Sequence, residues 1–452
     1  MTRYHRLSLV LGPMLLVSVA YCATVSEEPD PTPADWVGAV PIGNEQESFR
    51  PHVAMDPDGN AVAVWDEDEF RLTQEDIWSS RYTPTVGWSA PEEIGGDTEG
   101  AAATYGRVAM DSEGNAVVVW HESDETKTFS IWSNRYEATA GWGTAGRFDT
   151  EDPGDALFPQ IAMNAEGTAV VVWHQDENIW SKRYTPSTGT WDGAERIDRG
   201  SGNSELHPPQ VAIDAEGNAV AVWHEFDGTR FNIWSNRYEA TDGWGTAELI
   251  GTDDDGNAKF PQVAMDAEGS AVAVWHQSDG ERFNILFNRY EATAGWGTAG
   301  LIEADDDGDA MFPQVAVDAQ GNAVVVWERS LGTSVEIWSN RYTPSGGWGR
   351  SPERIEANEG GSLKPKVAVD SEGNAVAVWT QYDGTFDNDN VWSNHYDAAT
   401  ARWGVAQAIE HYDNGNAWTP QVAMDPHGNA IAVWVQGGAV TAQIWSNRLE
   451  RP

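Results

Sequence analysis

The sequence predicts an all-β protein that folds as an eight-bladed β-propeller with four antiparallel strands in each blade. A stretch of ten residues, Asp-Ala-Glu-Gly-Asn-Ala-Val-Ala-Val-Trp at 214–223, recurs in eight close copies that lie 50 to 55 residues apart. A repeat of this length that holds four short strand patterns has the size of one propeller blade. The copies end at Trp65, Trp120, Trp173, Trp223, Trp275, Trp327, Trp379 and Trp434.

Each element of the repeat has a local physical reason. Asp followed by a variable pair and then Gly suits a type I turn that ends in a left-handed glycine. The Ala-Val-Ala-Val-Trp that follows is apolar at every position, as in a strand that is covered on both faces. Within the unit at 261–312, the pattern predicts strand A at 262–265, strand B at 271–275, strand C at 284–290 and strand D at 296–302.

The two ends of the repeat region predict a closed ring. The region begins at 35–42 with a match to strand D alone, and it stops after 444–448, which matches strand C. The N-terminal strand D therefore joins the C-terminal strands A–C, which leaves only short, protected edges. We expect one propeller domain over 35–450. The A–B and C–D turns are short, whereas the B–C and D–A loops on the other face are varied and acidic, so we expect function on that loop-rich face.

The first 34 residues have the pattern of an export signal and a linker. The apolar run at 7–20 follows basic residues and is too short to span a membrane, which is typical of a signal peptide over 1–20. We therefore expect an exported protein, located in the periplasm, outside the cell or on the outer membrane as an anchored lipoprotein. Cys22 is the candidate lipid-attachment residue, although Tyr21 stands where lipoproteins carry a small residue. The acidic, Pro-rich segment 21–34 has the composition of a disordered linker, and we expect no transmembrane span after signal removal.

The net charge of −44, from 71 acidic and 27 basic residues, excludes some classes of binding partner. Such a surface repels nucleic acids and anionic lipid headgroups, so we expect neither as a partner. It suits divalent cations, basic proteins or solubility alone, and we expect a monomer. Calcium is the candidate cofactor, because clustered carboxylates beside glycine invite this ion; a solvated loop is the alternative. The candidate calcium ligands in the D–A loops are Asp253, Asp254, Asp255, Asp305, Asp306 and Asp307.

Polar residues directly after the core tryptophan form the first candidate binding site. Four consecutive blades carry histidine there, followed by Glu or Gln, and imidazoles in such an arc can bind a ligand or sense pH. Copies in neighbouring blades lie on the order of 10 Å apart, too far to share one metal ion. The alternative is a set of hydrogen-bonded polar residues at a strand end. The candidate ligand-binding residues are His121, Glu122, His174, His224, Glu225, His276 and Gln277.

The arginine of strand C forms a second candidate set with the neighbouring Tyr and Trp. A guanidinium binds oxyanions and aromatic rings stack on sugar faces, so these residue types suit a sugar or carboxylate. The alternative is that each Arg pairs with the Asp of a turn. The seven arginines are Arg81, Arg135, Arg183, Arg237, Arg289, Arg341 and Arg448, and His395 replaces the residue in blade 7.

The repeat Gly-Asn-Ala-Val-Ala-Val-Trp, with Ile-Trp-Ser-Asn-Arg-Tyr and Gly-Trp-Gly, resembles uncharacterised β-propeller repeat proteins that bacteria export. The match covers 35–448, and that family brings no established activity. More remotely, the architecture resembles sialidase-type and lectin-type propellers. The sialidase turn motif places Asp, Gly and Trp closer together than Asp214, Gly217 and Trp223, so no catalytic residue is carried over.

These features together favour an exported, non-enzymatic binding propeller. We expect it to recognise a carbohydrate or a cell-envelope or extracellular partner through its acidic loop-rich face, with sites that repeat in pockets between blades and bind multivalently. One alternative is a glycoside hydrolase or lyase that uses carboxylates at the central channel, with raised pKa values in a pocket that lacks eightfold symmetry. Another is a structural scaffold of an envelope complex. The sequence holds no serine-nucleophile motif and no phosphate-binding Gly loop, so no catalytic residue is predicted.

Overall fold

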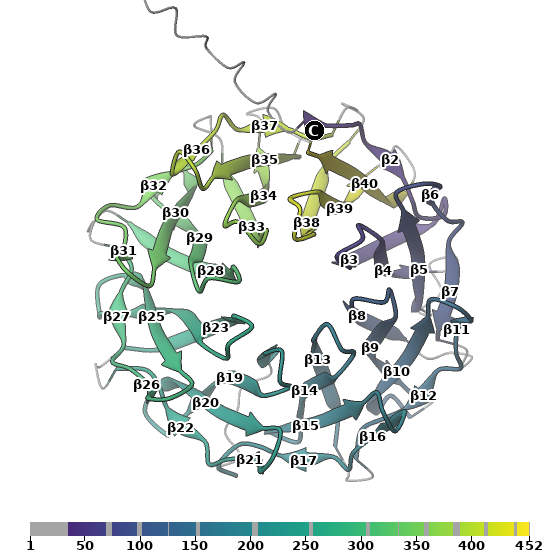
Figure 1. Cartoon of the computed structure of the whole chain (residues 1–452), viewed down its shortest axis with the longest axis horizontal. Coiled ribbons are helices and arrows are strands. Elements are labelled where there is room, and N and C mark those ends of the chain that lie inside the picture. Colours follow the sequence, from purple (N-terminus) through teal and green to yellow (C-terminus); the bar gives the residue numbers. More distant parts are fainter. Residues whose placement is uncertain are drawn as a thin grey trace, which may run out of the picture.

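Eight β-sheets surround a common axis in the computed structural model of the chain (Figure 1). It describes residues 35–68, 75–96, 102–124, 126–150, 154–200, 207–252, 256–303, 308–332, 334–356, 361–382, 389–410, 415–437 and 441–451. The expected signal peptide, linker and Cys22 lie outside these residues. So do the six aspartates that we named as calcium ligands. In the described parts of the chain, no helix has the length and apolar character needed to cross a membrane.

Each sheet is one blade and has four strand positions, with an outermost strand split into two short pieces. The innermost strands are β3 (Glu47–Met55), β8 (Ala103–Met110), β13 (Ala156–Met163), β18 (Gln210–Ile213), β23 (Ala258–Met265), β28 (Asp309–Val317), β33 (Ser362–Val369) and β38 (Ala417–Met424). The second strands are β4 (Ala61–Asp68), β9 (Ala116–Ser123), β14 (Ala169–Gln175), β19 (Ala219–Phe226), β24 (Ala271–Ser278), β29 (Ala323–Ser330), β34 (Ala375–Tyr382) and β39 (Ala430–Gly437).

The outer half of each blade follows the same order around the ring. The third strands are β5 (Glu75–Thr83), β10 (Phe129–Glu137), β15 (Asn178–Thr185), β20 (Phe231–Glu239), β25 (Phe283–Glu291), β30 (Val335–Thr343), β35 (Asp389–Asp397) and β40 (Ala442–Glu450). The outermost pairs of blades 1 to 7 are β6 (Gly87–Trp88) with β7 (Glu92–Gly95), β11 (Gly141–Trp142) with β12 (Gly146–Arg147), β16 (Thr190–Trp191) with β17 (Glu195–Arg196), β21 (Gly243–Trp244) with β22 (Glu248–Leu249), β26 (Gly295–Trp296) with β27 (Gly300–Leu301), β31 (Gly347–Trp348) with β32 (Glu353–Arg354), and β36 (Arg402–Trp403) with β37 (Gln407–Ala408).

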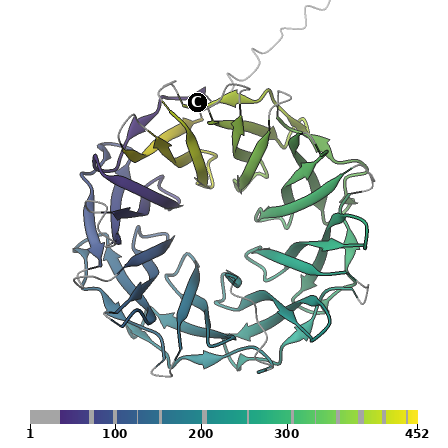
Figure 2. The ribbon, with the colours of Figure 1, turned by 180° about the vertical axis from the view of Figure 1, so that it is seen from behind.

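The ring closes as the sequence predicts. The N-terminal strands β1 (Asp35–Trp36) and β2 (Val40–Pro41) pair antiparallel with β40, so the first segment of the propeller completes blade 8. The register sets Trp36 opposite Leu449 and Val40 opposite Ser446. The purple and yellow ends of the chain accordingly lie side by side in Figures 1 and 2.

The second strand β24 runs three residues beyond its predicted end at Trp275, and β25 is one residue longer at each end than predicted. The fourth and the innermost strands differ more. The fourth strand is not continuous: in blade 5 the residues between β26 and β27 leave the ladder, although the amide of Gly297 still bonds the carbonyl of Arg289. The innermost strand β23 begins at Ala258, four residues earlier than expected. A bulge between Lys259 and Gln262 interrupts its pairing with β24, and Phe260 within it has a φ of 54°.

The core lies between neighbouring blades. The tryptophan of each second strand is at most 2% exposed and packs on the valines of the preceding blade, as Trp275 packs on Val220 and Val222. Burying such a side chain is among the largest apolar contributions that one residue makes. In seven blades its indole Nε1 donates to the Glu or Gln two residues later. These pairs are Trp65–Glu67, Trp120–Glu122, Trp173–Gln175, Trp223–Glu225, Trp275–Gln277, Trp379–Gln381 and Trp434–Gln436.

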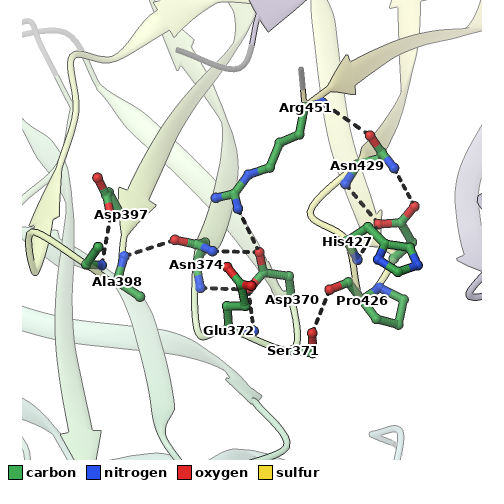
Figure 3. Close-up of polar contacts among 12 residues, drawn as sticks. Asp370, Ser371, Glu372, Asn374, Asp397, Ala398, Pro426, His427, Asn429 and Arg451 are labelled. Carbon is green, nitrogen blue, oxygen red and sulfur yellow. Dashed lines mark hydrogen bonds and ion pairs between the residues drawn. The ribbon is translucent and has the colours of Figure 1, made fainter. Parts of the chain in front are cut away.

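The aspartate of the A–B turn, replaced by Asn164 in blade 3, organises its loop, as blade 7 illustrates (Figure 3). Asp370 Oδ1 accepts the amides of Glu372 at 2.9 Å and Asn374 at 2.8 Å, and its Oδ2 accepts from Asn374 Nδ2 at 2.7 Å. Asn374 Oδ1 in turn accepts the amide of Ala398 at 3.0 Å, which ties this turn to the C–D turn. The Asp-x-x-Gly-Asn motif therefore satisfies backbone donors that would otherwise be unpaired.

Candidate functional site

Two regions present polar and aromatic side chains to open space. The first consists of pockets between neighbouring blades, beside the C–D turns; we call them the junction pockets. Three of them have cavity volumes of about 360 Å³ between blades 2 and 3, 260 Å³ between blades 8 and 1, and 180 Å³ between blades 6 and 7. All three are lined by the Ser-Asn-Arg segment of one blade and by a Tyr and a Trp of the next.

The arginine of each junction pocket stacks on the tyrosine of the following blade. The guanidinium carbon lies 4.6 to 5.5 Å from the ring centroid at seven of the eight junctions. These pairs are Arg81–Tyr136, Arg135–Tyr184, Arg183–Tyr238, Arg237–Tyr290, Arg289–Tyr342, Arg341–Tyr396 and Arg448–Tyr82. A cation over an aromatic face is attracted by the ring quadrupole, so each pair also holds two blades together.

The guanidinium retains a polar edge toward the pocket. Arg135 Nη1 donates to the Tyr184 hydroxyl at 2.7 Å and lies 3.2 Å from Glu137 Oε1, and about a third of the Arg135 side chain is exposed. Trp191 from the C–D turn lies beside Tyr184, with ring centroids 5.3 Å apart. The pocket therefore combines a charged donor with an aromatic wall.

The eighth junction, between blades 7 and 8, is different. His395 stands in place of Arg, and Leu449 stands in place of Tyr, so both halves of the stacked pair are missing together. Arg451 instead reaches back from blade 8, with its Nη1 3.4 Å from Asp370 Oδ2, and its amide bonds Asn429 Oδ1 at 3.1 Å (Figure 3).

The junction pockets lie at the C–D turns and not on the loop-rich face where we expected function. Their walls come from the end of the third strand and from the glycine and tryptophan of the turn, residues that repeat with little change from blade to blade. Short, uniform turns still form pockets here because two neighbouring blades leave a gap at their outer ends.

The second region is the axis of the ring, where the innermost strands of all blades except blade 4 carry the bulge described for β23. The residue at the bulge has a φ between 48° and 61° in seven blades, a conformation that non-glycine residues adopt rarely and at a cost of roughly 1–3 kcal/mol. We call these residues, with His207 of blade 4, the collar. They are Arg50, Tyr105, Phe158, His207, Phe260, Phe312, Lys364 and Thr419.

The histidines predicted as ligand-binding residues lie beneath the collar. Nδ1 of His121 accepts the amide of Phe158 at 3.2 Å, and Nδ1 of His276 accepts the amide of Phe312 at 3.3 Å. In each case one blade supplies the acceptor and the next blade supplies the strained bulge. Asp66 and Glu328 occupy the same position in other blades and accept the amides of Tyr105 at 3.1 Å and Lys364 at 2.7 Å.

Burial keeps these imidazoles neutral. It lowers the pKa of His121 and His224 to about 3 and that of His276 to about 4. His121, His174, His224 and His276 are between 2% and 4% exposed. His224 also packs against the rings of His207, Phe231 and Phe260. The arc that the sequence predicts is present, but the collar covers it.

The carboxylates and amides predicted beside these histidines face the core tryptophans. Glu122, Glu225 and Gln277 are at most 5% exposed and accept the indole N–H bonds given above. Asp66 is fully buried; burial raises its pKa to about 6, and the nearby Arg50 opposes that shift. Across the described ranges, no three His, Cys, Asp or Glu side chains are grouped to hold a metal ion.

Two residues beyond the collar in seven blades, and three beyond it in blade 4, the innermost strands carry a ring of polar residues that we did not predict from the sequence. We call it the axial belt. The signal was readable in the repeat: the position is Gln in five blades and changes to a cation or histidine in three. The axial belt consists of His52, Arg107, Gln160, Gln210, Gln262, Gln314, Lys366 and Gln421.

A cavity of about 480 Å³, which we call the axial pocket, opens among the innermost strands of blades 6, 7 and 8. Its wall includes Gln314, Lys366 and Gln421 of the axial belt, and Phe312 and Lys364 of the collar. Phe312 is 39% exposed, so its ring is available to a ligand in the pocket. The pocket involves three blades with different residues at the same position, so it lacks the symmetry of the junction pockets.

Comparison with known proteins shows the fold alone. No protein-family model matches the chain, and no curated protein matches it in sequence. Among solved structures, the propeller of Dos1 is similar with a TM-score of 0.54 at 9% identity, over 92% of this chain and 95% of that one. A protein of unknown function from Dyadobacter fermentans has a TM-score of 0.47 at 12% identity, over 93% and 99% of the two chains. A mutant of the NanB sialidase from Streptococcus pneumoniae has a TM-score of 0.39 at 8% identity, over 91% and 71%.

Proposed function

We propose that this protein is an exported, non-enzymatic propeller that binds carbohydrate in its junction pockets. The observation that carries the proposal is repetition: pockets lined by equivalent residues recur at three blade junctions. The Arg–Tyr stack that borders them recurs at seven. The proposal of export depends on the sequence of residues 1–34.

The chemistry of the junction pocket suits a sugar. Its guanidinium and amide groups are donors for hydroxyl or carboxylate oxygens, and the half-buried Trp and Tyr offer faces on which the apolar side of a sugar ring stacks. Volumes of 180 to 360 Å³ lie at the small end of ligand pockets, which fits one sugar unit better than an extended chain.

The same pockets are poorly equipped for hydrolysis. Most glycosidases need a pair of carboxyl groups that flank the scissile bond. Among the described residues, Glu353 is the one carboxylate that lines the three pockets. Repeated weak sites on one rigid ring instead favour avidity, which can exceed the affinity of a single site by a factor of about 10²–10⁴.

The test is binding to a glycan array and to insoluble cell-envelope polysaccharide, with a triple variant R135Q/R341Q/R448Q. We expect the wild-type protein to bind and the variant to lose at least tenfold in apparent affinity. The matched control is R196Q, which removes an arginine whose side chain is 48% exposed and lies outside these pockets. Absence of glycan binding by the wild-type protein, or equal binding by the triple variant, would refute the proposal.

A glycoside hydrolase is the second candidate, and one observation favours it. Glu328 lines the axial pocket, and burial raises its pKa above the usual range of a glutamate, as a general acid requires. We therefore also propose assaying the wild-type protein and E328Q against a panel of aryl glycosides and polysaccharides. Turnover by the wild-type protein that E328Q abolishes would support this function, whereas no turnover on any substrate would exclude it in favour of binding.

A further inference from the structure

The axial belt departs from its repeat in one sector of the ring. Gln occupies the position in blades 3, 4, 5, 6 and 8, whereas blade 1 has His52, blade 2 has Arg107 and blade 7 has Lys366. Blades 1 and 2 adjoin, and blade 8, which keeps Gln421, separates them from blade 7, so the changes fall within one sector of four blades. Because five blades fold with Gln at this position, the fold by itself does not require a cation there.

Neither belt cation has a carboxylate at ion-pair distance among the described residues, and the charge of Asp66 acts on Arg107 from farther away. Arg107 Nη1 donates to the carbonyl of Gly106 at 2.8 Å, and Lys366 Nζ donates to Gln314 Oε1 at 2.9 Å. Within the described residues, neither side chain forms an ion pair. The chain carries 71 acidic residues, yet it leaves these two of its 27 bases facing the axis without one.

The two cations act on each other across the axis. Burial first, and then the charges of Arg107 and Lys364, lower the pKa of Lys366 to about 8. Burial also lowers the pKa of His52, helped by Arg107 and Lys366, so this imidazole is neutral. The two residues hold the same register on the innermost strands of their blades, with Lys366 opposite Val378 and Arg107 opposite Val119, so both positions border the axis. Like charges held together and partly desolvated destabilise the empty site.

The axial pocket provides room for a partner to these charges. Lys364 and Lys366 belong to its wall, Gln314 and Gln421 add amide groups, and Phe312 and Leu363, 39% and 42% exposed, form an apolar rim. Amides offer donors to an oxyanion and the rim can contact a carbon skeleton. The strained collar backbone at Phe312 and Lys364 fixes this rim in place.

We propose that the axial pocket binds an anionic ligand, a compound with a phosphate or carboxylate group, with Lys366 and Lys364 in the wall and the charge of Arg107 adding to theirs. An acidic protein that concentrates unpaired cations at one point attracts anions there and repels them elsewhere, so the site discriminates strongly by charge. This inference is independent of sugar binding at the junction pockets.

The test is isothermal titration calorimetry with inorganic phosphate and with galacturonate, using galactose as the neutral match of galacturonate. We expect phosphate or galacturonate to bind in the axial pocket, with the stronger of the two identifying the anionic group. Added salt should weaken the binding. The variants K366Q and R107Q should each lose about tenfold or more in affinity, while K366R retains most of it.

Folding of these variants is secured by the repeat, because Gln is the native residue at five equivalent positions. R196Q serves as the charge-matched control and should bind as the wild-type protein does. The triple variant R135Q/R341Q/R448Q should retain the anion site, which separates this inference from the proposed function. The inference is overturned if neither anion binds, or if K366Q and R107Q bind it as tightly as the wild-type protein.

Discussion

The junction pockets and the axial pocket differ in how they use the repeat. At the junctions, the same Arg, Tyr and Trp recur from blade to blade, and the stacked pair joins neighbouring blades. At the axis, the default residue Gln is replaced in blades 1, 2 and 7 by residues that the fold does not need. Side chains that keep the symmetry contribute to packing whether or not they also bind a ligand. Side chains that break it at a cost in stability are the stronger indication of a specific site.

The junction between blades 7 and 8 supports this distinction. His395 and Leu449 replace both members of the stacked pair, which shows that Arg and Tyr act as a unit. Arg451 then provides a charge for Asp370, so the aspartate of that turn still has a cation near it (Figure 3). The repeated Arg and Tyr therefore have a structural role, and where they are absent Arg451 takes over part of it.

The largest effect should come from the symmetric core. Replacing Trp120 by Ala leaves a cavity and removes the donor of Glu122, so we expect a loss of about 3–5 kcal/mol in unfolding free energy. Chemical denaturation followed by tryptophan fluorescence and circular dichroism measures it. W327A is the matched variant, because no hydrogen-bond partner is found for Trp327 Nε1 among the described residues. A loss below about 1 kcal/mol in both variants would contradict our view of the core.

A smaller effect should follow from breaking one turn. Asp111 accepts the amides of Glu113 and Asn115 and the side chain of Asn115, at 2.8 to 3.0 Å. D111A leaves these donors without their acceptor and should cost about 1–3 kcal/mol, measured by the same denaturation. D111N should cost less, because Asn164 already holds the equivalent turn in blade 3. If D111A and D111N were equally destabilised, the hydrogen bonds of the Asp111 side chain would not be the source of the stability of this turn.

Lys366 should make the free energy of unfolding depend on pH. The pKa of Lys366 is about 8 in the folded protein, whereas the ordinary value for a lysine is 10.5. Between pH 8 and pH 10.5 the unfolded chain therefore binds the proton more tightly than the folded protein does. The stability contributed by this group therefore rises with pH over this window. K366Q should be more stable than the wild-type protein at pH 7, by up to roughly 3 kcal/mol, and the difference should vanish toward pH 10.5.

Paired denaturation curves of K366Q and the wild-type protein at several pH values measure this difference. The charged groups that face the lysine are Arg107, Lys364 and, in the pocket wall, Glu328. R107Q should raise the pKa of Lys366 and shrink the effect. A variant that is less stable at pH 7 would show that the lysine is structural.

The smallest effect should come from a single junction. Removing the guanidinium of Arg341 from the face of Tyr396, to which it also donates a hydrogen bond at 2.9 Å, should cost about 0.5–1 kcal/mol. R341Q should not change anion binding at the axis. The exposed Arg402 offers the control, and R402Q should leave stability unchanged. A loss of several kcal/mol would place this arginine among the core residues.

Most of the fold could be predicted because its determinants are local and repeated. Trp at fixed spacing, the Asp-x-x-Gly-Asn turn and the unmatched strand patterns at the two ends predict eight blades and their closure, which the structure confirms. The split of the fourth strand and the bulge at Phe260 were not predictable in the same way. At the equivalent bulges the amides of Phe158 and Phe312 bond acceptors in the preceding blade, 37 and 36 residues earlier in the chain, and hydrogen bonds of that kind leave no local pattern.

The same distinction between local and tertiary determinants applies to the candidate sites. The residues of the junction pockets were identified from sequence as a possible set of Arg, Tyr and Trp, because their chemistry is evident from residue type. His121 and its equivalents were identified too, but their burial beneath the collar was decided by the bulge of the next blade.

The sequence by itself determined the repeat, its turns and the side chains that each blade offers. Tertiary structure decided which of those side chains meet. Ring closure brings Arg107 and Lys366 to one axis although 258 intervening residues separate them in the chain. Charges that are far apart in sequence interact only when the fold brings them close together, and their distance is a property of the assembled ring and not of any one repeat.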